Sequence, residues 1–90
     1  MLHVTKAKYL DGYRIHVAFS NGEQGVVDLE DALWGPAFEP LQDLEAFKRF
    51  HVSETFRTVC WDNGADFAPE FLYDKMMKHA MGTEAGRRDA

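Results

Sequence analysis

The stretch that decides the fold is Trp61-Asp62-Asn63-Gly64-Ala65-Asp66-Phe67-Ala68-Pro69-Glu70-Phe71-Leu72-Tyr73. It predicts the end of a buried strand, then a tight turn, then a helix. Asn63-Gly64 suits the turn because glycine accepts a positive φ. Pro69 suits the first helical position, where its missing N–H costs nothing. The periodicity that follows predicts a helix from Pro69 to about residue 81.

Three carboxylates, Asp62, Asp66 and Glu70, lie in this strand-to-helix junction. Paired carboxylates can act as general acid and base or hold a hard cation. Asp and Asn also supply the local hydrogen bonds that turns and helix starts need. Because Ala68 stands at the preferred cap position, we expect Asp66 to substitute as the helix cap. The candidate structural or ligand motif comprises Trp61, Asn63, Gly64, Asp66, Pro69, Glu70 and Tyr73.

The first third of the chain predicts a three-stranded antiparallel meander. Between residues 13 and 19, apolar and polar side chains alternate with a period of two, as in a strand with one buried face. A first strand over residues 2–10 changes phase, which predicts a bulge near Thr5 or Lys6. Asp11-Gly12 and Asn21-Gly22 are hairpin-turn signals, and a third strand is expected over residues 23–28.

The middle of the chain predicts short elements. We expect Asp28 to cap a helix over residues 29–34 and Asp43 to cap another over 44–50, separated by a loop at 35–40. Further strands are expected at Val52 and over residues 56–61. The fold class is therefore α+β: the meander and one or two further strands form one sheet, on which short helices and a C-terminal helix pack. Residues 1–81 are expected to form a single domain, and 82–90 a disordered tail.

Charge and composition limit the classes of partner. The net charge is −5, and residues 21–47 hold seven acids and no Lys or Arg. Such a stretch repels a phosphate backbone, so the domain alone is not expected to bind nucleic acid. It suits a basic protein partner, although a simply solvated acidic surface gives the same pattern. Open strand edges make a homodimer a further expectation.

The sequence carries no signal for a membrane or an exported protein. It has no apolar stretch of about 20 residues and no basic segment followed by an apolar run. The single cysteine, Cys60, can form no internal disulfide. A reducing, cytoplasmic setting without membrane contact is expected.

Signals for catalysis are sparse. The four histidines include no pair three or four residues apart in a helix, so no metal site is predicted. Cys60 lies between Val59 and Trp61 with Asp62 beyond, which favours a small buried hydrophobe over an activated thiol. The sequence has no phosphate-binding loop, serine elbow or Cys-x-x-Cys pair. We predict no catalytic residue, no metal ligand and no cofactor, and therefore no enzyme.

The order of several short motifs resembles the bacterial domain family of unknown function numbered 2442. The blocks are Leu10-Asp11, Phe19-Ser20-Asn21-Gly22-Glu23, Val27-Asp28-Leu29, Pro40-Leu41-Gln42-Asp43 with Phe47, and Trp61-Asp62-Asn63-Gly64-Ala65-Asp66 with Pro69-Glu70 and Leu72-Tyr73. The last block, with its spacing, is the most specific. Two features differ from the family: Ala68 stands where a capping hydroxyl is frequent, and the tail beyond Tyr73 is longer.

The resemblance implies a small α+β domain with short helices on a mainly antiparallel sheet. Some members of the family are fused to a helix-turn-helix domain. Many others stand alone and are encoded beside another small protein, an arrangement similar to toxin–antitoxin pairs. The family offers no catalytic residues to transfer, and too little chain follows residue 81 for a helix-turn-helix unit, so DNA binding is not expected to transfer.

Three functions follow as hypotheses. The first is a non-catalytic protein-interaction module, antitoxin-like, whose protein partner is encoded nearby. The alternative is a small-ligand sensing domain, related to those fused to helix-turn-helix domains, with a pocket near Trp61, Asp62 and Asp66. The least favoured is an enzyme that uses the three junction carboxylates, which would require a raised pKa on one of them.

Overall fold

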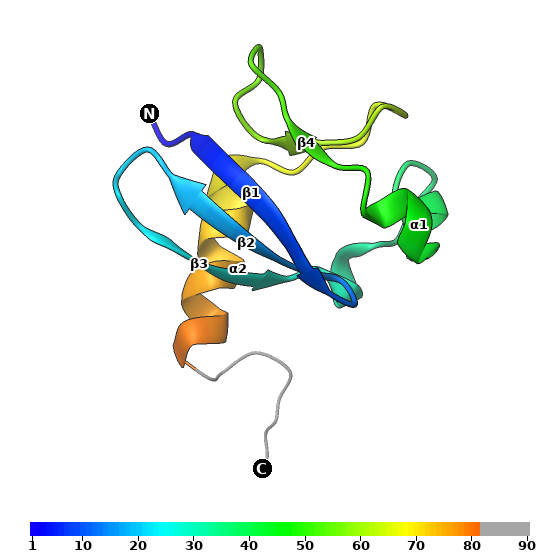
Figure 1. The fold of residues 1–90 in the computed structure, drawn as a ribbon, viewed down its shortest axis with the longest axis horizontal. Helices are drawn as coiled ribbons and strands as arrows, with labels where there is room; N and C mark the ends of the chain where they lie inside the picture. The colour runs from blue at the N-terminus through cyan, green and yellow to red at the C-terminus, as the bar shows by residue number, and fades with distance from the viewer. Residues whose placement is uncertain (82–90) are drawn as a thin grey trace.

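The computed structural model describes residues 1–81, which combine two antiparallel sheets with short helices and a longer C-terminal helix (Figure 1). The elements in chain order are β1 (Val4–Asp11), β2 (Arg14–Phe19), β3 (Gln24–Asp28), the 3-10 helices η1 (Glu30–Ala32) and η2 (Glu39–Gln42), α1 (Leu44–Phe47), β4 (His51–Val52), β5 (Val59–Cys60) and α2 (Pro69–Met81). The predicted α+β class is confirmed. The tail predicted over residues 82–90 lies outside the described residues.

The predicted meander is confirmed, with the sheet order β1-β2-β3 and antiparallel pairing throughout. The β1–β2 register shifts between Val4 and Lys6, where the change of phase predicted a bulge. Gly12 and Gly22, at the two hairpin turns, have φ angles of 47° and 89°. Both turns therefore use the left-handed conformation that glycine adopts without a steric penalty.

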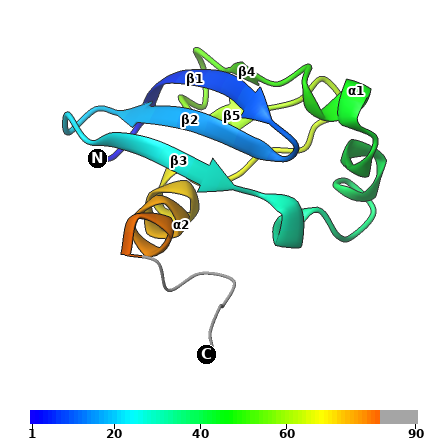
Figure 2. The same ribbon diagram turned by 60° about the horizontal axis from the view of Figure 1, so that its bottom comes forward.

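Helix α2 covers one face of this sheet (Figure 2). The sheet contributes Ile15, Val17 and Val27 to the core, and the helix contributes Leu72 and Met76. These five side chains are at most 3% exposed. Helix α2 approaches β3 closely at Gly25, where a Cβ atom would lie 2.9 Å from Cγ of Met76. A larger residue at this position would force the Met76 side chain or the helix to shift.

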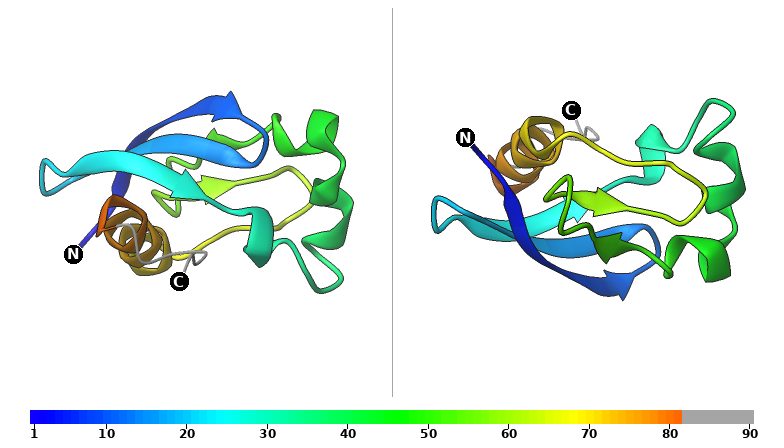
Figure 3. Two further views of the ribbon diagram at one scale, coloured as in Figure 1. Left: turned by 90° about the horizontal axis from the view of Figure 1, so that it is seen from below. Right: turned by 90° about the horizontal axis from the view of Figure 1, so that it is seen from above.

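The prediction of one continuous sheet is wrong, because β4 and β5 form a separate two-stranded sheet. Figure 3 shows β4 running beside β1. The Val4 N–H of β1 donates to the carbonyl of Arg57, in the connection between β4 and β5, at 2.9 Å. The strand expected over 56–61 shrinks to Val59–Cys60. Ser53 Oγ accepts the N–H groups of Thr55 and Phe56, so a turn takes up the first residues of the expected strand.

The short helices are shorter than the sequence predicted. Asp28 Oδ1 does accept the Glu30 N–H at 3.0 Å, but the helix that follows is only the 3-10 turn Glu30–Ala32. Helix α1 ends at Phe47, and the Asp43 side chain makes no capping bond to it. The predicted loop at 35–40 contains the start of η2, which has a proline in its first turn. Single turns of this kind depend on tertiary packing, because isolated short helices are marginal in water.

Aromatic rings connect these elements across the core. The Phe47 ring meets Tyr13 at 5.3 Å and Trp61 at 5.8 Å, and Trp61 meets Phe67 at 5.8 Å. Phe67 in turn stacks on Phe38 at 4.6 Å and on Phe71 at 5.2 Å. We call these six residues the aromatic chain. It runs from the meander, through the buried centre, to the first turn of α2, and such ring pairs add to the stability gained from burial.

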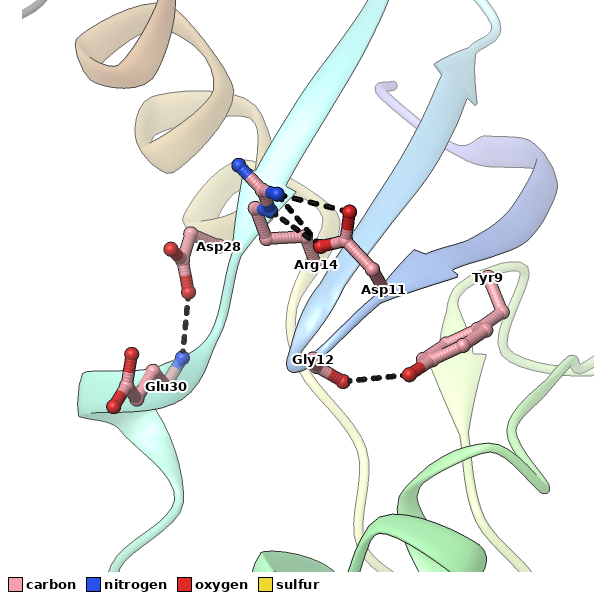
Figure 4. A network of polar contacts seen from close by, with 6 residues as sticks. All are labelled: Tyr9, Asp11, Gly12, Arg14, Asp28 and Glu30. Atoms are coloured by element: carbon pink, nitrogen blue, oxygen red, sulfur yellow. Dashed lines mark hydrogen bonds and ion pairs between the residues drawn. The ribbon is translucent and has the colours of Figure 1, made fainter.

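Polar contacts secure the end of the meander near the first hairpin (Figure 4). The Arg14 guanidinium donates to both carboxylate oxygens of Asp11, at 2.7 and 2.9 Å. This hydrogen bonding, with the Asp11 charge, raises the pKa of Arg14 above its ordinary value. The Tyr9 hydroxyl donates to the Gly12 carbonyl at 3.0 Å. These contacts fix the turn.

Candidate functional site

The predicted turn after β5 is built by Asn63. The Trp61 N–H donates to the Ala65 carbonyl at 2.9 Å, and the Gly64 N–H donates to the Trp61 carbonyl at 3.1 Å. Gly64 has a φ of 93°, as a three-residue hairpin loop with a left-handed last residue requires. Asn63 Oδ1 accepts the Ala65 N–H at 3.0 Å, while Nδ2 donates to the Ala37 carbonyl at 3.0 Å. One asparagine therefore shapes the turn and ties it to the loop before η2.

The apolar residues of the predicted motif face the core. Trp61 is 4% exposed, and its indole N–H donates to the Phe47 carbonyl at 2.9 Å. Pro69 begins α2, as the sequence predicted. The Tyr73 ring packs edge-on against Phe19 at 5.3 Å. The packing of these side chains holds the elements together.

The three junction carboxylates are exposed, and the structure does not gather them into a pocket. Within residues 1–81, the Asp66 side chain makes no hydrogen bond, so the expected helix cap is not observed. Residues 65–67 run back along β5: Asp66 bridges Cys60, and the Phe67 N–H donates to the Val59 carbonyl at 3.3 Å. This extended course buries Ala65 and Phe67 and turns Asp66 outward.

The structure brings Cys60, His51 and Asp62 together, a juxtaposition that the sequence analysis missed. His51 and Cys60 are register partners of β4 and β5. The Cys60 Sγ lies 3.3 Å from His51 Nε2, and His51 Nδ1 lies 3.8 Å from Asp62 Oδ1. The order resembles a nucleophile, a base and an orienting carboxylate. This juxtaposition could have been inferred from the sequence only by predicting that residues 51–52 pair with residues 59–60.

Electrostatics oppose thiol activation at this site. Burial raises the pKa of the Cys60 thiol, and the charges of Asp66 and Asp62 raise it further. A reactive cysteine needs the opposite, an electropositive setting that stabilises the thiolate. The Asp62 side chain is 97% exposed, so it does not hold the imidazole in a fixed orientation. The arrangement supports a weak thiol–imidazole contact.

A second candidate site is a hollow of about 400 Å³ where the aromatic chain reaches the surface. We call it the aromatic groove. Its lining comprises Asp31, Ala32, Trp34, Phe38, Phe67, Phe71 and Lys75. Trp34 follows η1 and is 72% exposed, an unusual exposure for a ring of this size.

A lysine and a carboxylate meet in the aromatic groove. Lys75 Nζ donates to Asp31 Oδ1 at 2.9 Å and lies 5.8 Å from the centre of the Phe71 ring. The Lys75 side chain is 11% exposed, whereas that of Asp31 is 72% exposed. The sequence analysis missed this site because its residues come from η1, the following loops and α2. The four-residue spacing of Phe67, Phe71 and Lys75 was the only local signal.

Another hollow, of about 440 Å³, lies over β1 and β2 and is mildly basic, with Lys6, Lys8 and His16 in its lining. Neither hollow is lined by Trp61, Asp62 or Asp66, where the ligand-sensing alternative expected a pocket. Among residues 1–81, no three His, Cys, Asp or Glu side chains are grouped to hold a metal ion. No helix in the same range is long and apolar enough to cross a membrane.

Comparison with known proteins gives a family and a structural neighbour. No curated protein matches the chain. The crystal structure of NE0471 from Nitrosomonas europaea, whose name presents it as a candidate DNA-binding protein, is similar over 90% of this chain, with a TM-score of 0.77 and 31% identity. The match spans 52% of NE0471, about half of its length. The family model described as "Protein of unknown function (DUF2442)" matches residues 4–77. The chain therefore belongs to the DUF2442 family.

Proposed function

We propose that this protein is a non-catalytic interaction module that binds a protein partner through the aromatic groove. The observation that carries the proposal is Trp34, a large side chain left 72% exposed beside a hollow lined by further rings. Exposed aromatic side chains next to a concave surface are typical of binding hot spots. The acidic charge of residues 21–47 favours a basic partner.

The proposal excludes catalysis because neither set of polar side chains suits it. The junction carboxylates are solvated and line neither hollow. The Cys60 thiol is disfavoured as a thiolate by its surroundings. We further propose that the partner is encoded nearby, that the pair is similar to a toxin and its antitoxin, and that it acts in the cytoplasm.

Co-expression with the product of the adjacent gene tests this function. We expect the two proteins to co-purify, and we expect Trp34→Ala to abolish or strongly weaken the complex. Phe56→Ala is the matched control, because Phe56 is 68% exposed but lies outside the lining of the groove. Failure of the wild-type pair to associate, or equal loss with both variants, would contradict the proposal.

A small-ligand sensor is the second candidate function. The volume of the aromatic groove lies in the range of small-molecule sites, and one buried cation and one carboxylate converge on it. A thermal-shift screen with small metabolites separates the candidates. A rise in Tm that Trp34→Ala removes, without any protein partner, would favour sensing over partner binding.

We do not extend DNA binding from NE0471 to this chain, in part because the match covers only about half of that protein. The acidic stretch over residues 21–47 works against phosphate binding. Fluorescence anisotropy with a short duplex at low salt checks this point. Binding that Lys6→Ala and Lys8→Ala weaken would assign a nucleic-acid role to the basic hollow instead.

We also propose that the chain forms a homodimer. Pairing of open strand edges would be the route, since an unpaired edge presents free N–H and C=O groups. Light scattering coupled to size exclusion measures the mass directly. A mass of one chain across a wide concentration range would remove the dimer and leave partner binding intact.

A further inference from the structure

We propose that the aromatic groove receives an arginine side chain of the partner protein. This inference rests on the proposed interaction function and adds the chemistry of recognition. The guanidinium would stack on the exposed Trp34 ring and pair with the carboxylate of Asp31. Three observations on the described residues support it: the position of Lys75, the unused capacity of Asp31 and Trp34, and the sign of the surrounding charge.

Lys75 shows how a cation is held in this groove. Its ammonium lies 2.9 Å from Asp31 Oδ1 and 5.8 Å from the centre of the Phe71 ring. A carboxylate and a ring face are the two groups that stabilise a partly desolvated cation. The groove is thus already built to hold positive charge, and a neutral apolar ligand would gain nothing from the Asp31–Lys75 pair.

Capacity for a second cation remains on the solvent side. Only Oδ1 of Asp31 contacts Lys75, and the Asp31 side chain is 72% exposed, so Oδ2 is open to an incoming donor. Trp34 has no ring partner among residues 1–81 and lines the same hollow. An indole presents the ring face that binds cations best. Asp31 and Trp34 therefore offer a carboxylate oxygen and a ring face to a second cation beside Lys75.

The charge around the groove selects the sign of the ligand. Glu30, Glu39 and Glu70 are exposed, and each is adjacent in sequence to a residue of the lining. Together with Asp31 these carboxylates outnumber the single ammonium of Lys75 in the lining, so a carboxylate-bearing segment would be repelled and a cationic one attracted. Arginine fits better than lysine because its planar guanidinium can stack on a ring while donating hydrogen bonds to a carboxylate. The site as a whole fits a protein segment with an arginine among apolar residues.

A titration of the full chain with one synthetic peptide tests the inference. The probe is a capped pentapeptide with a central arginine flanked by leucines, and the control peptide carries citrulline in place of arginine. The readout is the pair of tryptophan indole N–H signals in a ¹H–¹⁵N spectrum. Trp34→Phe identifies the signal of Trp34, and the hydrogen-bonded indole of the buried Trp61 serves as an internal reference.

We expect the arginine peptide to shift the Trp34 signal while the Trp61 signal stays in place. Because the charge of the guanidinium is the main determinant, the citrulline peptide should bind about ten-fold more weakly or worse. Asp31→Asn should weaken the arginine peptide by a similar factor. Glu54→Gln, which removes an exposed acid outside the groove lining, should leave its affinity within about two-fold.

Several results would overturn the inference. Equal affinity for the arginine and citrulline peptides would make the groove an apolar site. A Trp34 signal that moves with protein concentration alone would identify a second copy of the chain as the occupant. A Trp34 signal that moves in the double variant Arg87→Ala, Arg88→Ala without peptide would identify the chain's own C-terminal segment. If the product of the adjacent gene co-purifies but the peptide gives no response, the interaction function stands and arginine recognition is ruled out.

Discussion

The two tryptophans lie in contrasting environments: Trp61 belongs to the buried aromatic chain, and Trp34 lies outside that chain at the surface. Trp61 is 4% exposed, surrounded by rings, and its indole N–H is bonded to the Phe47 carbonyl. Trp34 is 72% exposed beside the aromatic groove. A buried indole stabilises a fold when its N–H finds a partner, whereas an exposed one leaves its area available for binding. The difference separates the residues that build this protein from those that we assign to its function.

Substitution at the buried centre should have the largest effect. Phe47 is fully buried and its ring meets four other aromatic rings. We expect Phe47→Ala to lower the free energy of unfolding by about 3–5 kcal/mol, because it removes these contacts and leaves a cavity. Urea unfolding measures the loss. If the midpoint hardly moved, the core would not be organised around this ring.

The turn asparagine should have the next largest effect. Asn63→Ala removes one bond within the turn and one to the Ala37 carbonyl, for an expected loss of about 1–3 kcal/mol. Asn21→Ala is a matched control, since Asn21 Oδ1 accepts only the Glu23 N–H in its own turn. The difference between the two losses in thermal unfolding measures the bond to Ala37. Equal losses would mean that this bond adds nothing.

Substitution of the exposed Trp34 should be nearly neutral for stability. We expect Trp34→Ala to change the free energy of unfolding by less than about 0.5 kcal/mol, in contrast to its effect on partner binding. Chemical denaturation of both proteins, monitored by circular dichroism, provides the measurement. A loss of more than about 2 kcal/mol would place Trp34 with the structural residues.

Asp66→Ala distinguishes a capping role from an exposed one. The sequence predicted a cap, whose loss costs about 0.5–2 kcal/mol. Since the Asp66 side chain points outward without a hydrogen bond to any described residue, we now expect a change below about 0.5 kcal/mol. A melting curve for this variant decides between the two values, and a loss above 1 kcal/mol would restore the cap.

The smallest effect concerns pH. The pKa of the folded Cys60 thiol is raised, chiefly by burial, so the folded state holds its proton more tightly than the unfolded state does. Its contribution to stability is therefore complete below the ordinary thiol pKa of about 8.5 and is lost as pH rises through the folded value. Thiolate absorbance against pH should give a midpoint above the ordinary thiol pKa value. A midpoint below 7 would point to activation by His51.

The sequence specified the regular elements better than the site. Alternation of apolar and polar side chains between residues 13 and 19 identified β2, and Pro69 identified the start of α2, because both signals are local. The strand expected over 56–61 was wrong because Ser53 captures the N–H of Phe56, a competition that propensity does not register. The aromatic groove could not be predicted, since Asp31 and Lys75 meet only through the tertiary fold.

The close approach at Gly25 gives indirect control over the groove. Gly25 allows Met76 to settle against β3, and Lys75 immediately precedes Met76 on α2. A methyl group at Gly25 would have to displace the thioether or push the helix outward, and the helix carries two groove-lining residues with it. In the second case Gly25→Ala alters the width of the groove without replacing any residue of its lining. The distance between β3 and α2 at Gly25 therefore determines how wide the aromatic groove is.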